Sequence, residues 1–256
     1  MAERFNLAGR RAVVTGGANG IGRAITVALA EAGAQVFFTT RADTDAAESL
    51  LVELRAFNIE AAYMAMEATA VDAPEQLFAA AEAAIGPVDV LVNNAAETTR
   101  TGFLDMQTDE YARTLDVNLT FPYFTLQRFA RNLVARGEAG SAINISSISS
   151  FKAISRLSAY QCSKAGLAML TKSAAYELAP YGIRVNTISP GLTATKGNRD
   201  QWHGDPALWA ERGKTIPLAR AGVPDDIAGA AVFLASDASA WMTGADLVID
   251  GGDAVV

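Results

Sequence analysis

Hydrophobic and polar positions follow two rhythms along the chain. Short apolar runs bounded by turn residues predict strands at 12–15, 35–40, 61–65, 88–92, 141–145, 184–188 and 246–249. Longer segments with apolar residues at helical spacing predict helices at 21–32, 46–57, 74–84, 110–135 with a break near Pro122, 159–179 and 224–235. Strands that alternate with helices form parallel sheets buried on both faces. The pattern therefore predicts an α/β fold, a doubly wound, Rossmann-like, seven-stranded parallel sheet with helices on both faces.

One long segment interrupts this alternation. Residues 196–220 have no strand signal and contain Gly197, Gly204, Pro206, Gly213 and Pro217. Glycine and proline break regular structure, so we expect a mobile substrate flap at about residues 192–220. No repeat, low-complexity tract or linker divides the sequence, and 256 residues suit one large α/β domain. We therefore expect a single dinucleotide-binding oxidoreductase domain over residues 1–256.

Composition and charge limit the partners and the compartment. The chain is 50% hydrophobic and 19% charged, which suits a protein that folds around its own core. A net charge of −7 makes nucleic acid and an anionic membrane surface poor partners. Residues 1–10 lack the apolar core of a signal peptide, and no run is long enough to span a membrane. We expect a cytoplasmic protein with a small-molecule partner.

The lone cysteine and the lone histidine limit the chemistry further. Cys162 has no second cysteine with which to form an internal disulfide, which suits a reducing compartment. His203 is the single histidine, so neither a cysteine cluster nor a histidine-built metal site is possible, and we expect no metal. A Ser/His/Asp hydrolase would depend on His203, and no Gly-x-Ser-x-Gly elbow follows a predicted strand. These counts disfavour a hydrolase.

A glycine-rich turn connects the first predicted strand to the first predicted helix. Gly16, Gly20 and Gly22 lie in the sequence Thr-Gly-Gly-Ala-Asn-Gly-Ile-Gly. Such a turn lets the backbone approach a pyrophosphate, and the N–H groups at the helix start attract anions. The spacing is looser than Gly-x-Gly-x-x-Gly, so a tight connection without a ligand remains the alternative. Arg41 ends the second strand, where an arginine accommodates the 2′-phosphate of NADP; a solvated Arg41 beside Asp43 is the other possibility.

Tyr160 and Lys164 lie one turn apart on a predicted helix. A tyrosine with an ordinary pKa of about 10 is a poor acid or base near neutral pH. We expect the nearby ammonium to lower the pKa of Tyr160. Ser147 follows the fifth predicted strand, at the carboxyl edge where α/β proteins bind ligands, and a serine there can steady a carbonyl oxygen.

These residues together make the chain resemble the short-chain dehydrogenase/reductase family from Gly9 to Gly252. The glycine turn resembles the family's cofactor loop, and Asn93-Asn94-Ala95-Ala96 resembles its Asn-Asn-Ala-Gly stretch. Pro190-Gly191 and Asp250-Gly251-Gly252 are similar to its later signatures. The residues that match its catalytic tetrad are Asn118, Ser147, Tyr160 and Lys164. The resemblance and the reasoning above assign cofactor contacts to Gly16, Asn19, Gly20, Ile21, Gly22, Arg41, Glu67, Ala68, Asn94, Ala95, Ala96, Tyr160, Lys164, Pro190, Gly191, Thr193 and Thr195.

The resemblance implies a reaction as well as a fold. It implies that Tyr160 exchanges a proton with the reacting oxygen, that Ser147 positions this oxygen, and that Lys164 lowers the Tyr160 pKa and binds the nicotinamide ribose. Asn118 would hold a water that links Lys164 to solvent. The cofactor would be NADP, with NAD possible, and the assembly a homotetramer. The sequence departs from the family's pattern at two positions, with Ala96 in place of glycine and Glu67 in place of aspartate. These departures place the neighbouring cofactor contacts in question.

The substrate is less well indicated. Asn198 and the sequence Ile216-Pro217-Leu218-Ala219-Arg220 resemble family members that oxidise aldoses, so we favour an aldose or a polyol. A 3-oxoacyl thioester or another ketone remains an alternative, as does a cofactor-binding sensor without catalysis. Lys152 and Arg156 either reach an anionic substrate group or are solvated loop charges, and the roles of Glu97 and His203 stay open.

Overall fold

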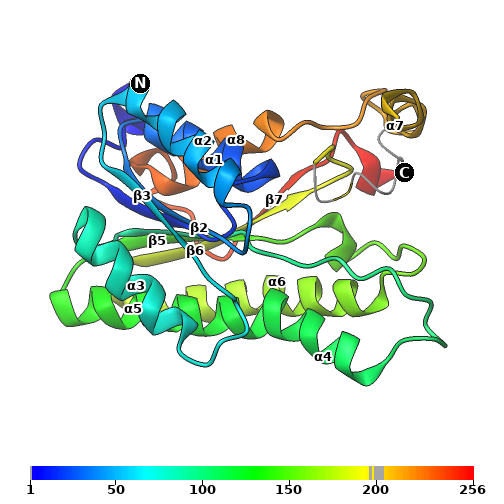
Figure 1. Cartoon of the computed structure of the whole chain (residues 1–256), viewed down its shortest axis with the longest axis horizontal. Coiled ribbons are helices and arrows are strands. Elements are labelled where there is room, and N and C mark those ends of the chain that lie inside the picture. The colour runs from blue at the N-terminus through cyan, green and yellow to red at the C-terminus, as the bar shows by residue number, and fades with distance from the viewer. Residues whose placement is uncertain (1, 196–197, 199–204) are drawn as a thin grey trace.

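The computed structural model describes residues 2–195, 198 and 205–256 (Figure 1). Its centre is a seven-stranded sheet in the order β3-β2-β1-β4-β5-β6-β7, and every strand pair is parallel. The strands are β1 (Arg11–Val14), β2 (Gln35–Thr40), β3 (Ala61–Ala65), β4 (Val90–Asn93), β5 (Gly140–Ile145), β6 (Ile183–Pro190) and β7 (Asp246–Ile249). The predicted seven-stranded Rossmann-like fold is confirmed.

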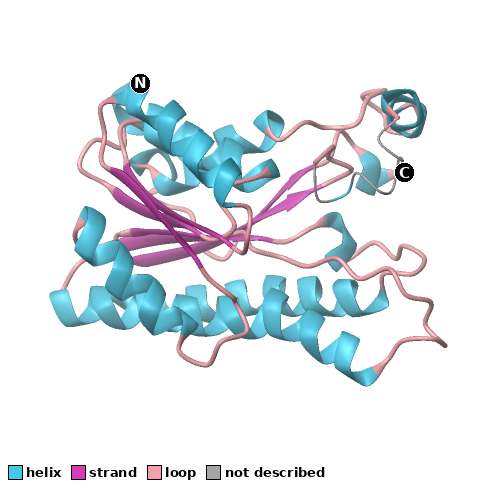
Figure 2. Ribbon diagram, in the orientation of Figure 1, coloured by secondary structure: helices cyan, strands magenta, loops and turns pink. Residues whose placement is uncertain are grey.

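Helices cover both faces of the sheet, as Figure 2 shows. One face packs against α1 (Gly20–Glu31), α2 (Thr44–Leu54) and α8 (Asp225–Ala235). The other packs against α3 (Ala73–Ile85), α5 (Phe121–Arg136) and α6 (Ser158–Leu178). Successive residues of β1 point to opposite cores, since Val14 belongs to the first and Val13 to the second. Strands buried on both faces explain why short, continuous apolar runs predicted them.

The interruption expected near Pro122 is found, but it is a π-helical turn rather than a gap between two helices. Helix α4 (Thr108–Leu115) continues through a π-helical turn (Asp116–Thr120) directly into α5. Pro122 is the second residue of α5, directly after this turn, and it has no N–H group with which to continue the helical hydrogen bonds. The irregularity therefore lies before the proline, in the turn that carries Asn118. Wide turns of this kind occur often at functional sites.

The segment expected to form a flap contains a helix that was not predicted. Helix α7 spans Pro206–Gly213, and Asp205 caps its start by accepting a hydrogen bond from the N–H of Ala207 at 2.8 Å. An acidic cap followed by proline is a typical helix start, so the signal was present among the helix-breaking residues. Thr193 and Gly222 form an isolated parallel bridge, which joins the two ends of this segment.

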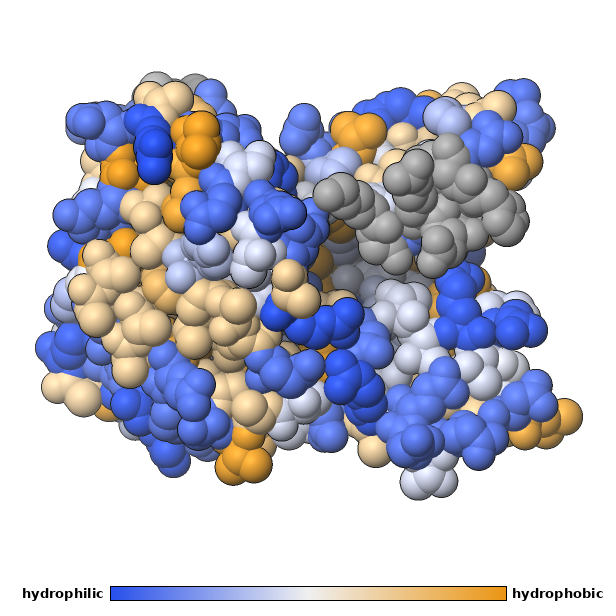
Figure 3. Space-filling view, viewed as in Figure 1, coloured by the Kyte–Doolittle hydropathy of each residue, from blue (hydrophilic) through white to orange (hydrophobic). Residues whose placement is uncertain are grey.

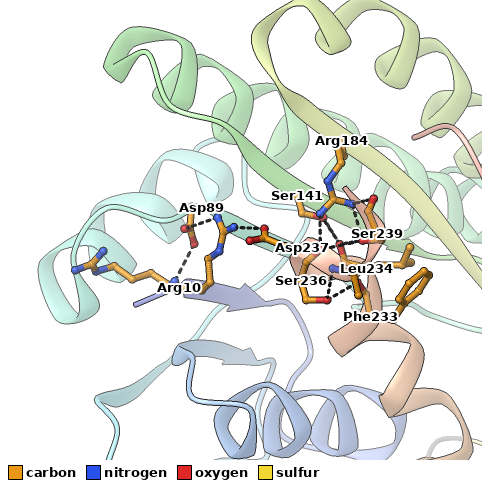
Figure 4. A network of polar contacts seen from close by, with 11 residues as sticks. Arg10, Asp89, Ser141, Arg184, Phe233, Leu234, Ser236, Asp237 and Ser239 are labelled. Atoms are coloured by element: carbon orange, nitrogen blue, oxygen red, sulfur yellow. Dashed lines mark hydrogen bonds and ion pairs between the residues drawn. The ribbon is translucent and has the colours of Figure 1, made fainter. Parts of the chain in front are cut away.

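A polar network closes the amino edge of the sheet, opposite the edge expected to bind ligands (Figure 4). Arg184, at the start of β6, donates to the carbonyls of Leu234 at 2.9 Å, Ser236 at 3.3 Å and Ser239 at 3.1 Å. Arg10, just before β1, pairs with Asp237 at 2.9 Å and with Asp89 at 3.3 Å. The network ties the C-terminal end of α8 to the starts of several strands.

Candidate active site

The glycine turn after β1 has a shape that other residues do not adopt easily. Gly16 has φ +64° and Gly20 has φ +55°, both in the left-handed region. A Cβ at Gly22 would lie 2.2 Å from the carbonyl oxygen of Gly16 and 2.4 Å from Nδ2 of Asn94. Glycine at position 22 is thus required by packing within the turn itself, and the turn leads into the N-terminus of α1, whose N–H groups attract anions.

Side chains from neighbouring strands hold this turn in place. Asn94, after β4, donates from Nδ2 to the carbonyls of Thr15 at 3.0 Å and Gly16 at 3.1 Å. The Thr15 hydroxyl accepts from the N–H groups of Asn94 at 2.9 Å and Ala95 at 3.0 Å. Thr39, at the end of β2, accepts from the Gly16 N–H at 2.9 Å. Thr15 and Thr39 lie at the carboxyl ends of predicted strands, but their role in holding the turn was not predicted from sequence.

Ser147, Tyr160 and Lys164 meet at the carboxyl edge of β5. Ser147 follows β5 and caps a short 3₁₀ turn by accepting from the Ser149 N–H at 3.1 Å. Tyr160 and Lys164 lie in the first turns of α6, and Lys164 is almost completely buried. Lys164 donates from Nζ to the carbonyl of Ile145 at 2.8 Å, and the same atom lies 5.6 Å from the centroid of the Tyr160 ring. The three side chains come from two elements that pack closely.

Burial dominates the electrostatics of this group. It raises the pKa of Tyr160, while the hydrogen bond with Ser147 and the positive charge of Arg100 lower this pKa to a lesser extent. The expectation that the Tyr160 pKa lies below its ordinary value is therefore wrong for this structure. The reason is that desolvation of the phenolate outweighs the nearby charges. Burial also lowers the pKa of Lys164 from 10.5 to about 8.

Asn118 connects two of the segments that form the site. Its Oδ1 accepts from the Glu97 N–H at 2.8 Å, and its Nδ2 donates to the Glu97 carbonyl at 2.8 Å and to Oγ of Ser163 at 3.1 Å. Asn118 is fully buried in the π-helical turn. Its side chain thus joins the segment after β4 to α6, on which Tyr160 and Lys164 lie. The water that the resemblance implied at Asn118 stays a prediction.

A cleft of about 1070 Å³ runs along the carboxyl edge of the sheet, and Figure 3 shows the molecule hollowed between its α7 end and its α4 end. Each residue expected to contact the cofactor lines this cleft, and so does Ser147. The fourth residue of the tetrad, Asn118, is not among the lining residues and supports the wall through Glu97 and Ser163. His203 lies outside the described residues. Sequence reasoning therefore brought together residues that the fold places in one continuous cleft.

Comparison with known proteins agrees with this geometry. Residues 16–253 match a family model described as enoyl-(acyl carrier protein) reductase. The L-rhamnose 1-dehydrogenase (NAD(P)(+)) of Azotobacter vinelandii is 41% identical over 243 residues, which cover 94% of each chain. The chain belongs to the short-chain dehydrogenase/reductase family. Its members are oxidoreductases, and the predicted family and enzyme class are confirmed.

Other members of the short-chain dehydrogenase/reductase family extend the comparison. The D-erythrulose reductase of Gallus gallus is 39% identical, with 98% of each chain covered. A crystal structure of a gluconate 5-dehydrogenase from Burkholderia cenocepacia, in complex with NADP and tartrate, has a TM-score of 0.91. It is 34% identical and covers 100% of this chain and 99% of its own. The names of these relatives support binding of NADP or NAD by this chain.

The far end of the cleft carries a group of four charged side chains. Glu97 receives a hydrogen bond from Nε of Arg113 at 2.9 Å and lies 3.9 Å from Nη1 of Arg41. Arg113 also approaches Glu67 at 3.7 Å. Arg113, on α4, was missed because no local motif connects it to residues 67 and 97. Arg41 therefore neighbours a carboxylate from another element, rather than being only a solvated charge.

The segment after β6 closes the opposite side of the cleft. The Gly191 N–H donates to the Ile249 carbonyl at 2.9 Å, and a Cβ at Gly191 would lie 2.5 Å from Cβ of Asp250. Asn198 accepts from the Thr195 N–H at 2.9 Å and donates to the Thr193 carbonyl at 2.6 Å. These contacts explain why the Pro190-Gly191 and Asp250-Gly251-Gly252 motifs occur together: they pack side by side.

Within the described ranges, no helix is both long enough and apolar enough to cross a membrane. The same residues contain no group of three or more histidine, cysteine, aspartate or glutamate side chains arranged to hold a metal ion.

Proposed function

We propose that this chain is an NADP-preferring dehydrogenase that interconverts a hydroxyl and a carbonyl group on a sugar or polyol. The observation that carries the proposal is the meeting of Ser147, Tyr160 and Lys164 in one cleft with the glycine turn. The glycine turn supports binding of a dinucleotide, because it lines the cleft and leads into the N-terminus of α1. A nicotinamide cofactor, when bound in this cleft, would supply or accept the hydride.

Side chains of the protein would transfer the proton to and from the substrate oxygen. In the reductive direction Tyr160, kept neutral by burial, donates its phenolic proton to the substrate oxygen. Ser147, hydrogen-bonded with Tyr160, would hold the same oxygen. Lys164 would stabilise the phenolate that remains, and its pKa of about 8 leaves it largely charged at neutral pH. In the oxidative direction Tyr160 takes the proton back.

The preference for NADP rests on Arg41 at the end of β2. Its guanidinium lies in the cleft and is mostly exposed, so it is available to an incoming phosphate. Its distance of 3.9 Å from Glu97 is too long for a tight hydrogen-bonded pair. A 2′-phosphate, with up to two negative charges, would compete well for it. Nearby Asn19, Ile21 and Ala68 line the same end of the cleft.

The substrate class rests on the relatives and the cleft. L-rhamnose, D-erythrulose and gluconate are named as substrates of the three relatives, and all are polyhydroxy compounds. Thr98, Ser149 and Thr215 also line the cleft, and hydroxyl groups suit a hydroxylated ligand.

The assembly and the location are part of the proposal. Exposed apolar side chains lie on the outer helices at Tyr123, Phe124, Met169 and Tyr176, and near β7 at Trp241. Such residues favour burial between subunits, which supports a homotetramer. Static light scattering that finds a stable monomer would contradict it. The single cysteine and the acidic charge suit the cytoplasm.

A substrate screen tests the proposed activity. Reduction of NADP and NAD is followed with aldoses, polyols and sugar acids, and oxidation of NADPH with ketoses and a 3-oxoacyl thioester. We expect turnover of at least one sugar or polyol that disappears in Tyr160→Phe. Turnover of the thioester alone would place the chain among acyl reductases. Tight binding of NADP without turnover of any substrate would indicate a sensor instead.

A further inference from the structure

A lysine and an aspartate form an ion pair in the wall of the cleft. Lys152 donates from Nζ to Oδ1 of Asp253 at 3.0 Å and also to the Asp253 carbonyl. Both residues line the same cleft as the catalytic group, so Lys152 is not a solvated loop charge. Arg156, the other cation of this loop, does not line the cleft and donates to the Arg100 carbonyl at 3.3 Å.

The backbone of Lys152 is joined to the sequence neighbours of the catalytic residues. Its N–H donates to the carbonyl of Ile148 at 2.8 Å, and its carbonyl accepts from Nε2 of Gln161 at 3.0 Å. Ile148 follows Ser147, and Gln161 follows Tyr160. The two elements that position the residues proposed to act on the substrate oxygen therefore position Lys152 as well.

The turn after β7 fixes the position of Asp253. The Asp250 carboxylate accepts from the N–H groups of Gly252 at 2.8 Å and Ala254 at 2.7 Å. A Cβ at Gly252 would lie 2.9 Å from Cγ of Pro217, so the turn packs directly on the segment after α7. These contacts hold the backbone of Asp253 where its side chain meets its ion-pair partner.

The ion pair leaves hydrogen-bonding capacity on both partners. An ammonium has three N–H groups, and two of those on Lys152 have acceptors on Asp253. Among the residues that the structure describes, none donates to Oδ2 of Asp253. The two side chains are 33% and 24% exposed, which leaves each partly open. The pair thus offers a donor and an acceptor side by side, with no net charge.

Apolar side chains line the cleft together with this pair. Ile154 and Leu157 belong to the same loop as Lys152, and Ile216 precedes the proline on which the C-terminal turn packs. A sugar chain has both kinds of surface, because its C–H groups pack on apolar side chains and each of its hydroxyl groups donates and accepts a hydrogen bond. The composition of this wall therefore suits a polyhydroxy ligand.

We infer that Lys152 and Asp253 are specificity-determining residues that together bind two neighbouring hydroxyl groups of the substrate, the ammonium donating to one and the carboxylate accepting from the other. This inference rests on the proposed sugar or polyol dehydrogenase function and deepens it, because the hydroxyl groups concerned lie beyond the reacting carbon. Hydrogen bonds to charged groups are strong and directional, so the pair would favour one arrangement of hydroxyl groups over another.

Two ligands of the same six-carbon chain length test the inference. D-glucitol is neutral and D-gluconate carries a carboxylate at one end. Their binding is measured by calorimetry on the enzyme saturated with NADPH, with which neither ligand can be oxidised. Lys152→Gln and Asp253→Asn should each weaken D-glucitol about tenfold, the usual loss for one hydrogen bond to a charged group.

The affinity of D-gluconate relative to D-glucitol separates binding from a merely structural role. Asp253→Asn leaves the ammonium unpaired and should raise this ratio at least about threefold, whereas Lys152→Gln leaves the carboxylate unpaired and should lower it by a similar factor. An ion pair that only kept the wall in shape would weaken both ligands alike in both variants.

A second ion pair provides the matched control. Lys214 donates from Nζ to Oε2 of Glu211 at the end of α7, and both side chains are exposed and outside the cleft. Lys214→Gln and Glu211→Gln should change the two affinities and their ratio less than about twofold. Thermal unfolding checks that all four variants are folded.

No binding of either ligand to the unmodified enzyme would overturn the inference. So would a ratio that stays constant, or that shifts in the same direction in Lys152→Gln and Asp253→Asn. Tyr160-dependent turnover of a sugar in the substrate screen would in that case leave the proposed function standing, whereas no turnover of any sugar would remove that function as well.

Discussion

Each edge of the sheet has a buried cationic side chain, and the two differ in how firmly they keep their charge. At the amino edge, Arg184 donates to three backbone carbonyls and to Oγ of Ser239 at 2.8 Å. At the carboxyl edge, Lys164 is more deeply buried and donates to the carbonyl of Ile145. Burial lowers the pKa of both, but an arginine starts so high that it stays charged, whereas Lys164 falls to about 8.

This difference separates stability from function. The Arg184 charge joins the end of α8 to the sheet, and its acceptors are oriented helix carbonyls that attract a cation. Burial disfavours the positive charge of Lys164. That charge lies beside Tyr160, whose phenolate it would stabilise during proton transfer. Active sites commonly keep such groups at a cost in stability. Substitutions at the two edges should therefore affect different measurements.

The largest expected effect is on catalysis at the carboxyl edge. Tyr160→Phe removes the proton donor and should lower kcat by about 10²–10⁴-fold, since that is the usual contribution of general acid–base catalysis. NADP affinity and the thermal midpoint should stay nearly unchanged, because the ring is retained. Steady-state kinetics, cofactor titration and thermal unfolding measure the three quantities.

Tyr176→Phe provides the matched control for this experiment. Tyr176 lies on the same helix α6 but is exposed and lies outside the cleft. Its variant should retain the activity of the unmodified enzyme. A Tyr160→Phe enzyme with kcat within a few fold of normal would remove Tyr160 from the reaction.

Local patterns predicted the elements well and their interruptions poorly. Strands 35–40, 61–65 and 246–249 have the predicted bounds, because apolar runs between turn residues mark buried strands directly. Pro122 signalled an interruption, but not its form, a π-helical turn in which Asn118 contacts Glu97 and Ser163. Helix α7 was missed because its flanking glycines and proline outweighed its cap.

In the candidate site, too, local motifs predicted some features and missed those that depend on the tertiary structure. Ordered motifs predicted which residues line the cleft, because the carboxyl ends of parallel strands always meet at one edge. Sequence spacing predicted the neighbourhood of Tyr160 and Lys164, yet not the direction of the Tyr160 pKa, which depends on burial. Arg113 and Glu97 come together only in the tertiary structure. Pairs from distant elements are invisible to local patterns.

At the amino edge, Arg184→Met should affect stability and not catalysis. Methionine retains much of the apolar stem but leaves buried carbonyls unpaired, so we expect a loss of about 2–4 kcal/mol in the free energy of unfolding. Urea denaturation measures it, and kcat should change little. Arg55→Met serves as the exposed control. A stability equal to that of the unmodified protein would show that this network is dispensable.

Lys164→Met should change how stability depends on pH. The folded chain loses this proton near pH 8 and an unfolded lysine near 10.5, so the unfolded state binds more protons between these values. Stability from this group therefore rises as pH increases through that window. We therefore compare the free energy of unfolding of the unmodified protein with that of the variant. The difference, unmodified minus variant, should grow by up to about 3 kcal/mol as the pH rises through this window.

Urea titrations at pH 7.5, 9 and 10.5 follow this difference, and Lys172→Met is the control. Lys172 lies on α6 but is exposed and outside the cleft, so its difference should stay flat. A flat difference for Lys164→Met as well would mean that the folded protein does not penalise its charge.

The smallest expected effect concerns the loosely paired cation at the carboxyl edge. Arg10, at the amino edge, is held at 2.9 Å by Asp237, whereas Arg41 lies 3.9 Å from Glu97. If Arg41 is kept available for a 2′-phosphate, Arg41→Ala should lower the ratio of NADP to NAD affinity about tenfold, the loss of one charge-assisted contact. Glu97→Gln should move the ratio in the opposite direction, because it removes the carboxylate that competes for Arg41. Arg10→Ala should leave the ratio unchanged.

Fluorescence titration with both dinucleotides measures the affinity ratio of all three variants. An unchanged ratio in Arg41→Ala would assign the preference to another residue. Arg113 is then the nearest candidate, because it bonds to the same carboxylate.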